Sequence, residues 1–195
     1  DRRSENVTIR NVEIYNNGHA EYGSRGWFPE GAGIRLSGPN MVVERAIIHD
    51  NGQDAIQSMW HDNNISNFRI NQSWLYNGRP HLTVDESWNY CTHTDGLQIY
   101  DGGLISGITI ENSVVGPGFT NGLILGQTRT DNGAQADVHN VTLRNTLLTK
   151  AADNGLFGYE GSNSRGWRLD HVTMHCPKTK SVSYTHLTLP TTRLV

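Results

Sequence analysis

The stretch that decides the fold is NVTIRNVEIY, residues 6–15, because its pattern returns five more times along the chain. The pattern is apolar, any, apolar, any, a turn-forming residue, two residues of any kind, and a third apolar residue. Apolar residues two positions apart indicate a strand with one buried face. The turn-forming residue is expected to bend the chain, so that the third apolar residue points inward again. The six sets of apolar residues are Val7, Ile9 and Ile14; Met41, Val43 and Ile48; Phe68, Ile70 and Leu75; Ile108, Ile110 and Val115; Val141, Leu143 and Leu148; and Trp167, Leu169 and Met174.

A second short strand is expected between successive copies. Each of these strands begins with an apolar residue that follows Gly or Ala, and the five first members are Ile34, Ile56, Leu97, Leu123 and Leu156. The copies recur at intervals of 26 to 40 residues. One such repeat cannot bury its own apolar face, whereas stacked repeats can.

An irregular repeat of this length, built from short strands without helices, resembles the right-handed parallel β-helix superfamily. Pectate lyases, polygalacturonases and alginate-modifying enzymes share that fold. The resemblance covers residues 6–174 and implies an all-β, single-stranded solenoid of about six coils. A β-sandwich is the alternative, but its hairpins would not keep one template in register six times.

Both ends of the chain have the features of a gene fragment. The first residue is Asp1, and VSYTHLTLPT, residues 182–191, resembles the translation of a sequencing-library adaptor. We therefore expect a metagenomic fragment truncated at both ends, with a β-helix over residues 1–181 and a non-native tail over residues 182–195. The alternative for the tail is a natural C-terminal strand, because Thr and Leu alternate there.

The composition excludes several classes of partner and site. The formal net charge of −3 gives no indication of nucleic acid as a partner. No apolar run approaches the ~20 residues that span a bilayer. Cys91 and Cys176 have no zinc-site spacing, and no metal site is predicted from them. The resemblance implies a secreted, periplasmic or cell-surface protein whose signal peptide is not in this fragment.

Two connections at one corner of the expected solenoid are much longer than the others. Ile14 and Ile34 are 20 residues apart, and Leu75 and Leu97 are 22 apart, whereas the other three repeats use 8. Long loops on a solenoid tend to be functional, because the packed coils do not need them. The sequence therefore predicts a groove over the second strand column, walled by these loops.

The groove predicted in this way has the side chains of a polysaccharide site. Alternation along the strands turns Arg35, Gln57 and Gln98 outward, and the loops add Trp27, Trp88 and Arg79. Aromatic rings stack on the apolar faces of sugars, while amides and charges bind hydroxyls and carboxylates. An acidic or neutral glycan is the expected ligand. The alternative is that Trp27 and Trp88 only pack their own loops.

The candidate chemistry centres on CTHTDGLQIYDG, residues 91–102, which carries His93, Asp95 and Tyr100. Asp54 occupies the place of Asp95 in the preceding repeat, and neighbouring strands are about 4.8 Å apart. Two carboxylates at this distance could be the acid and nucleophile of a retaining glycosidase, or could bind Ca²⁺. A structural ladder is the alternative, because Asn121 and Asn154 continue the column in the next repeats.

The stretches HTDGLQI and TNGLILG resemble part of the polygalacturonase pattern, in which an Asn-Thr-Asp, an Asp pair and a Gly-His-Gly follow one another. Here Asp95 matches the first motif, the Asp pair is absent, and Asn121 stands where the His is expected. This departure argues against hydrolysis of that type. A lyase or epimerase would use His93 as base with Arg35 or Arg79 as charge partner.

Two functions remain. One is a polysaccharide lyase or hydrolase, and the other is a non-catalytic glycan-binding or cell-surface appendage domain.

Overall fold

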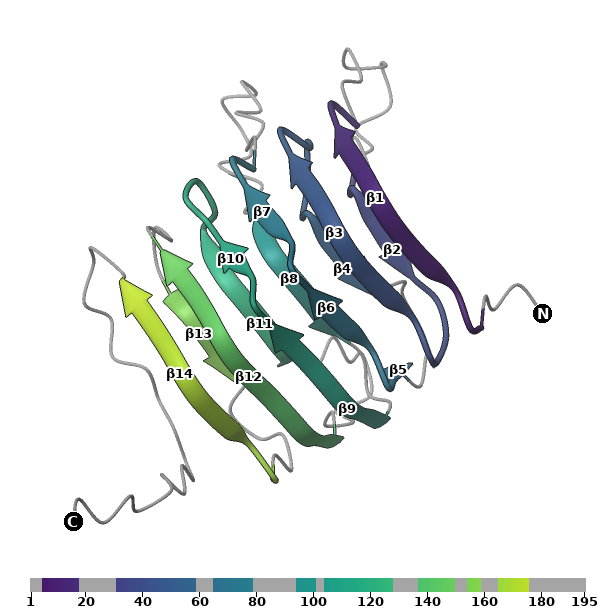
Figure 1. Ribbon diagram of the computed structural model, residues 1–195, viewed down its shortest axis with the longest axis vertical. Helices are drawn as coiled ribbons and strands as arrows, with labels where there is room; N and C mark the ends of the chain where they lie inside the picture. Colours follow the sequence, from purple (N-terminus) through teal and green to yellow (C-terminus); the bar gives the residue numbers. More distant parts are fainter. Residues whose placement is uncertain are drawn as a thin grey trace, which may run out of the picture.

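The computed structural model describes residues 5–17, 31–58, 65–78, 94–100, 104–127, 137–149, 154–158 and 165–175, and this part of the chain contains strands and no helix. The strands form two layers (Figure 1). The first layer, sheet A, consists of β1 (Thr8–Tyr15), β3 (Val42–His49), β5 (Ile65–Ser66), β6 (Arg69–Asn71), β7 (Trp74–Tyr76), β9 (Leu104–Glu111), β10 (Val114–Val115), β12 (Asp137–Thr149) and β14 (Arg168–His175). The second layer, sheet B, consists of β2 (Ile34–Leu36), β4 (Ile56–Ser58), β8 (Asp95–Tyr100), β11 (Asn121–Gln127) and β13 (Asn154–Gly158).

All strand pairs in the two sheets are parallel, and the chain passes back and forth between the sheets. The long strand β3 pairs with β1 along one edge, through residues 42–44 and 46–49. β6 pairs with residues 42–44 of β3 and β7 with residues 47–49, so these two short strands lie end to end along its other edge. β12 likewise pairs with β14 along one edge and with β9 and β10 along the other.

The apolar positions of the repeated template form continuous columns between the layers, as the sequence predicts. The second template position gives the aligned residues Ile9, Val43, Ile70, Ile110, Leu143 and Leu169. The third position gives Ile14, Ile48, Leu75, Val115, Leu148 and Met174. In the central repeats these side chains are fully buried. The template is therefore the pattern of a core that runs along the stack.

The turn-forming residue of each template copy adopts a left-handed backbone conformation. Its φ lies between 47° and 55° in Asn11, Arg45, Gln72, Asn112, Asn145 and His171. Asn tolerates this region better than most residues, and Asn145 Nδ2 donates to Asn112 Oδ1 at 2.9 Å. The bend that the sequence predicts between the second and third apolar positions is thus made by a single left-handed residue in each template copy.

A second column of left-handed residues precedes the first template position. Asn40 Nδ2 donates to Asn6 Oδ1, and Asn67 Nδ2 to Asn40 Oδ1, both at 3.0 Å. The next repeat has Gly107 at this place, with a φ of 65°. A Cβ at Gly107 would lie 2.9 Å from Asn67 Oδ1, so the glycine leaves room for the amide below it.

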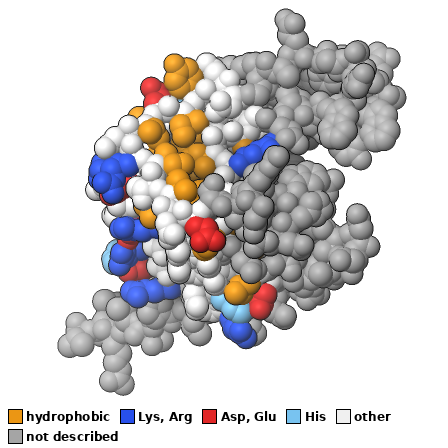
Figure 2. Space-filling view, turned by 90° about the vertical axis from the view of Figure 1, so that its right-hand side faces the viewer, with side chains coloured by type: hydrophobic (Ala, Val, Ile, Leu, Met, Phe, Trp, Pro, Cys, Tyr) orange, Lys and Arg blue, Asp and Glu red, His pale blue; other side chains and the backbone are white. Residues whose placement is uncertain are grey.

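The first and last strands of sheet A each pair with one described strand, β1 with β3 and β14 with β12. Their inward side chains are consequently only partly buried, and they comprise Val7, Ile9, Val12 and Ile14 at one end and Trp167, Leu169, Val172 and Met174 at the other. Figure 2 shows apolar side chains gathered on the face of the molecule at the β1 end. In the described residues, no helix is long and apolar enough to cross a bilayer.

Candidate functional site

The outward column that the sequence places on sheet B is present in the predicted register. Arg35 aligns with Gln57, Gln57 with Gln98, and Gln98 with Ile124. Gln57 Nε2 donates to Gln98 Oε1 at 3.4 Å, so the two amides bond along the column. Gln57, Gln98 and Ile124 are only 5%, 3% and 4% exposed. Alternation along a strand predicts which way these side chains point, but not that they are covered.

Asp54 and Asp95 lie on neighbouring repeats and are both buried. Asp54 Oδ1 accepts a hydrogen bond from the backbone N–H of Asp95 at 2.7 Å, and Asp54 Oδ2 accepts one from Gln57 Nε2 at 2.9 Å. Asp95 Oδ1 accepts from the backbone N–H and from Nδ2 of Asn121, at 3.0 and 2.9 Å. These are the contacts of the stacked turn that the sequence offers as the alternative to a catalytic pair.

The same contacts bear on the Ca²⁺ hypothesis. Both oxygens of Asp54 accept hydrogen bonds, and a cation would have to compete with those donors. Within the described ranges there is no group of three or more His, Cys, Asp or Glu side chains placed to hold a metal ion.

Several predicted site residues lie outside the described part of the chain. These are His93, Trp27, Trp88 and Arg79, together with the cysteines Cys91 and Cys176 and the tail over residues 182–195. Tyr100 ends β8, but its side chain is also outside the description. The structure therefore brings together Asp54, Gln57, Asp95 and Gln98 of the predicted set.

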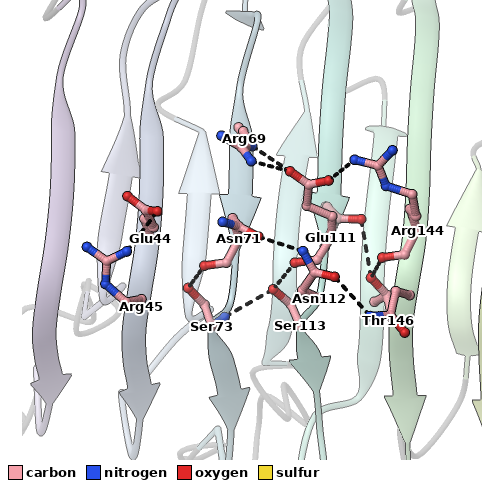
Figure 3. A network of polar contacts seen from close by, with 12 residues as sticks. Glu44, Arg45, Arg69, Asn71, Ser73, Glu111, Asn112, Ser113, Arg144 and Thr146 are labelled. Atoms are coloured by element: carbon pink, nitrogen blue, oxygen red, sulfur yellow. Dashed lines mark hydrogen bonds and ion pairs between the residues drawn. The ribbon is translucent and has the colours of Figure 1, made fainter.

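A charged network that the sequence analysis did not predict lies on the outer face of sheet A (Figure 3). The carboxylate of Glu111 is 3% exposed and receives the guanidinium groups of Arg69 and Arg144 from the two neighbouring repeats. Arg69 Nε lies 2.6 Å from Glu111 Oε1. The hydrogen bond from Arg144 is the main cause that lowers the pKa of Glu111, with Arg69 adding to it and burial acting against it.

An aromatic stack lies at the C-terminal ends of β1, β3 and β7 in the same sheet. The His49 ring lies between Tyr15, with ring centroids 5.2 Å apart, and Tyr76, with centroids 4.8 Å apart, and the planes are nearly parallel. His49 Nδ1 is 2.6 Å from Asp50 Oδ2 and Nε2 is 3.1 Å from Glu13 Oε1. Burial is the largest single influence and lowers the pKa of His49, but the two carboxylates together outweigh it, so the pKa is raised.

Next to this stack runs a row of outward-facing apolar residues, two of them exposed and two partly buried, which we call the Trp74 row. It consists of Ile47, Trp74, Val114 and Leu147, which are aligned in register on β3, β7, β10 and β12. Trp74 is 44% exposed and Ile47 40%. A shallow hollow of about 300 Å³ adjoins the row and is lined by Val114 and Leu147 together with Asn112, Ser113, Asn145, Thr146, His171 and Thr173.

The Trp74 row has a sequence signal that the template concealed. The template leaves the position before its third apolar residue unconstrained. In four consecutive copies it is Ile47, Trp74, Val114 and Leu147, all apolar. An outward position that is repeatedly apolar indicates a surface with a use other than solvation.

Comparisons with known proteins leave the family open. No family model and no curated protein matches the chain. Among solved structures, a periplasmic alginate epimerase, AlgG, is similar over 88% of this chain and 40% of its own, with 17% identity and a TM-score of 0.47. The Dettilon tailspike protein is similar over 87% of this chain and 41% of its own, with 11% identity and a TM-score of 0.42. This chain thus spans about two fifths of each of these proteins.

Proposed function

We propose that the chain forms about six coils of a right-handed parallel β-helix, over residues 1–181, and that it binds a polysaccharide in a groove over sheet B. The strand pairings support the solenoid. The strand pairs return to their starting point, in the order β3, β6, β9, β12, β10, β7 and β3 again. A closed barrel would give the same order of pairs. However, β1 occupies one edge of β3, so β6 and β7 must share the other edge. β6 and β7 therefore follow one another in the same layer of a stacked solenoid, whereas in a closed barrel they would be two separate neighbours on opposite edges of β3.

The observation that carries the binding proposal is the polar column of Arg35, Gln57 and Gln98. Three successive repeats present a hydrogen-bonding side chain at the same register of the outward face. Repeats stack at about 4.8 Å, so these polar groups lie in a line along the stack. Gln57 and Gln98 are buried and bond each other, whereas Arg35 is only partly buried and is the side chain of the column best placed to meet a ligand. A polysaccharide is a linear ligand with hydroxyl groups along its length, and the Arg35 guanidinium can bond hydroxyls or carboxylates. Such a protein would act outside the cytoplasm, where polysaccharides are met.

The ladder contacts of Asp54 and Asp95 argue against a catalytic role for these two carboxylates, and so favour a protein that binds a glycan over one that cleaves it with this pair. Each has an oxygen that accepts a hydrogen bond from the backbone of the next repeat. A nucleophile or general acid needs its oxygens at the substrate. The two residues are therefore assigned to holding the turn beneath the groove.

A polysaccharide lyase or hydrolase is the second candidate. Tyr100 is the last residue of β8, and His93 comes two positions before the first residue of that strand. Groups able to transfer protons thus cluster in one short segment. His93 would be the base and Arg35 or Arg79 the charge partner of an abstraction next to a uronate carboxylate.

The test is binding of the whole chain to immobilised alginate, pectin, cellulose and mannan. Wild-type protein should bind at least one of them, and Arg35→Ala and Trp88→Ala should each weaken that binding. Arg10→Ala is the matched control, because Arg10 is an exposed arginine on β1, paired with Glu44 in sheet A. Binding that survives both groove substitutions would contradict the groove.

The enzymatic candidate is tested on the same polymers by product formation. His93→Ala should abolish turnover and leave binding intact. Binding without turnover by the wild type would leave a non-catalytic glycan-binding or appendage domain.

A further inference from the structure

Trp74 is held in place although it lies at the surface. Its indole Nε1 donates to the carbonyl oxygen of Gly116 in the next repeat at 3.0 Å. Its ring packs beside that of Tyr76, with centroids 4.3 Å apart and planes tilted by 34°. The side chain is nevertheless 44% exposed. A rigid, exposed aromatic ring loses little conformational entropy when a ligand covers it, so this arrangement is suited to binding.

The surface around Trp74 is elongated along the stack. The four residues of the Trp74 row come from β3, β7, β10 and β12, which are neighbours in sheet A (Figure 1). Three steps of about 4.8 Å give the row a length of about 14 Å. The hollow lies at the Val114 and Leu147 end of the row, where two amide and three hydroxyl side chains help to line it. Two of its eight lining residues are apolar and six are polar, which suits a ligand with many hydroxyl groups.

The lining of the hollow gives an anionic ligand no counter-charge, and the neighbouring Arg144 is paired with Glu111. None of the eight residues that line the hollow is Asp, Glu, Lys or Arg. The one titratable side chain among them, His171, has its Nδ1 2.7 Å from Asp170 Oδ1. At the opposite end of the row, Glu13 and Asp50 flank His49. An acidic glycan would lie near these carboxylates without an arginine or lysine to meet it in the hollow.

We propose that the Trp74 row is a second carbohydrate-binding surface, which takes an uncharged oligosaccharide lying along the stack. The apolar face of one sugar stacks on the Trp74 indole. A neighbouring sugar occupies the hollow over Val114 and Leu147, where Asn145 and Thr173 bond its hydroxyls. This surface is on sheet A and the proposed groove is on sheet B, so either can bind without the other.

The experiment is isothermal titration calorimetry of the full chain with cellohexaose, mannohexaose, chitohexaose and an alginate hexasaccharide. At least one neutral hexasaccharide should bind. Trp74→Ala should weaken that binding about tenfold or more, since about 1.4 kcal/mol corresponds to tenfold and is within the worth of an aromatic contact. Trp74→Phe keeps a ring and should lose less than Trp74→Ala.

Two further variants separate the site from the fold. Asn145→Asp places a carboxylate at the rim of the hollow and should weaken binding without touching the indole. Leu104→Ala is the matched control, because Leu104 is a 39% exposed apolar residue at the start of β9 in the same sheet. Its binding should equal that of the wild type. Circular dichroism melts confirm that each variant is folded.

Three outcomes would overturn the proposal. They are no binding of any neutral hexasaccharide, equal binding by wild type and Trp74→Ala, and a self-association in sedimentation velocity that Trp74→Ala abolishes. The last outcome would mean that a second copy of the chain covers the row. If Arg35→Ala loses binding and Trp74→Ala keeps it, the result would support the groove over sheet B and contradict the Trp74 row. The reverse result would contradict only the groove.

Discussion

Asparagine and alanine at position 95 should have very different effects on stability. Asp95 Oδ1 accepts two hydrogen bonds, from N and Nδ2 of Asn121, and the side chain is fully buried. An asparagine oxygen can accept both. The two bonds lose their charge assistance, at about 1 kcal/mol each. The amide also avoids the free-energy cost of burying a carboxylate charge, which offsets much of that loss. We expect Asp95→Asn to change the free energy of unfolding by about 1 kcal/mol or less.

Alanine removes the acceptor and leaves two buried donors of Asn121 without it. Each such donor costs about 1–3 kcal/mol, so we expect Asp95→Ala to lower the free energy of unfolding by about 3–5 kcal/mol. Urea unfolding followed by tryptophan fluorescence measures both variants. A loss in Asp95→Asn as large as in Asp95→Ala would refute the ladder reasoning, because the charge itself would then be required. We also expect Asp95→Asn to bind glycan as well as the wild type does.

Three other predictions concern charge and the tail. The pKa of Glu111 is lowered in the folded state, so its contribution to stability is present above about pH 4.5 and is lost as pH falls through the folded pKa. Glu111→Gln should therefore flatten the acid part of the plot of unfolding free energy against pH. An acid part that is unchanged in this variant would contradict the prediction. The pKa of His49 is raised, so its contribution is complete below about pH 6.5 and is lost as pH rises through the folded pKa. His49→Gln should therefore be less stable than wild type at pH 5.5, with the gap closing by pH 9, and a gap that widens with pH would contradict the sign. Deleting residues 182–195 should leave the melting temperature unchanged or higher, whereas a fall of several degrees would show that the tail belongs to the fold.

The register of sheet A could be predicted from the sequence because a strand with one buried face repeats its apolar residues at fixed places. The columns through Ile110 and Val115 follow directly from the template. The turn position was predicted from its polar character alone. Arg45 and Gln72 show that the repeat imposes the left-handed conformation even on residues without Asn's tolerance for it.

The candidate site was less predictable, because the direction of a side chain says nothing of what lies over it. Gln57 and Gln98 point outward as the alternation requires and are nevertheless buried. The pair Asp54 and Asp95 had two sequence interpretations, and only the hydrogen bonds to the next repeat distinguish them. The network at Glu111 depends on residues 33 and 42 positions away, which a scan for local motifs does not join.

The left-handed column also determines where the protein can change its length. Its members are Asn11, Arg45, Gln72, Asn112, Asn145 and His171. The second and third apolar positions of the template are always five residues apart, as in Ile110 and Val115. One added residue there would turn every following side chain of the strand to the opposite face. The corner between the end of sheet A and the start of sheet B already accepts spacings from 8 to 22 residues. Natural variation and engineered peptide insertions should therefore accumulate at that corner, so that the chain can acquire new binding loops while its core keeps one register.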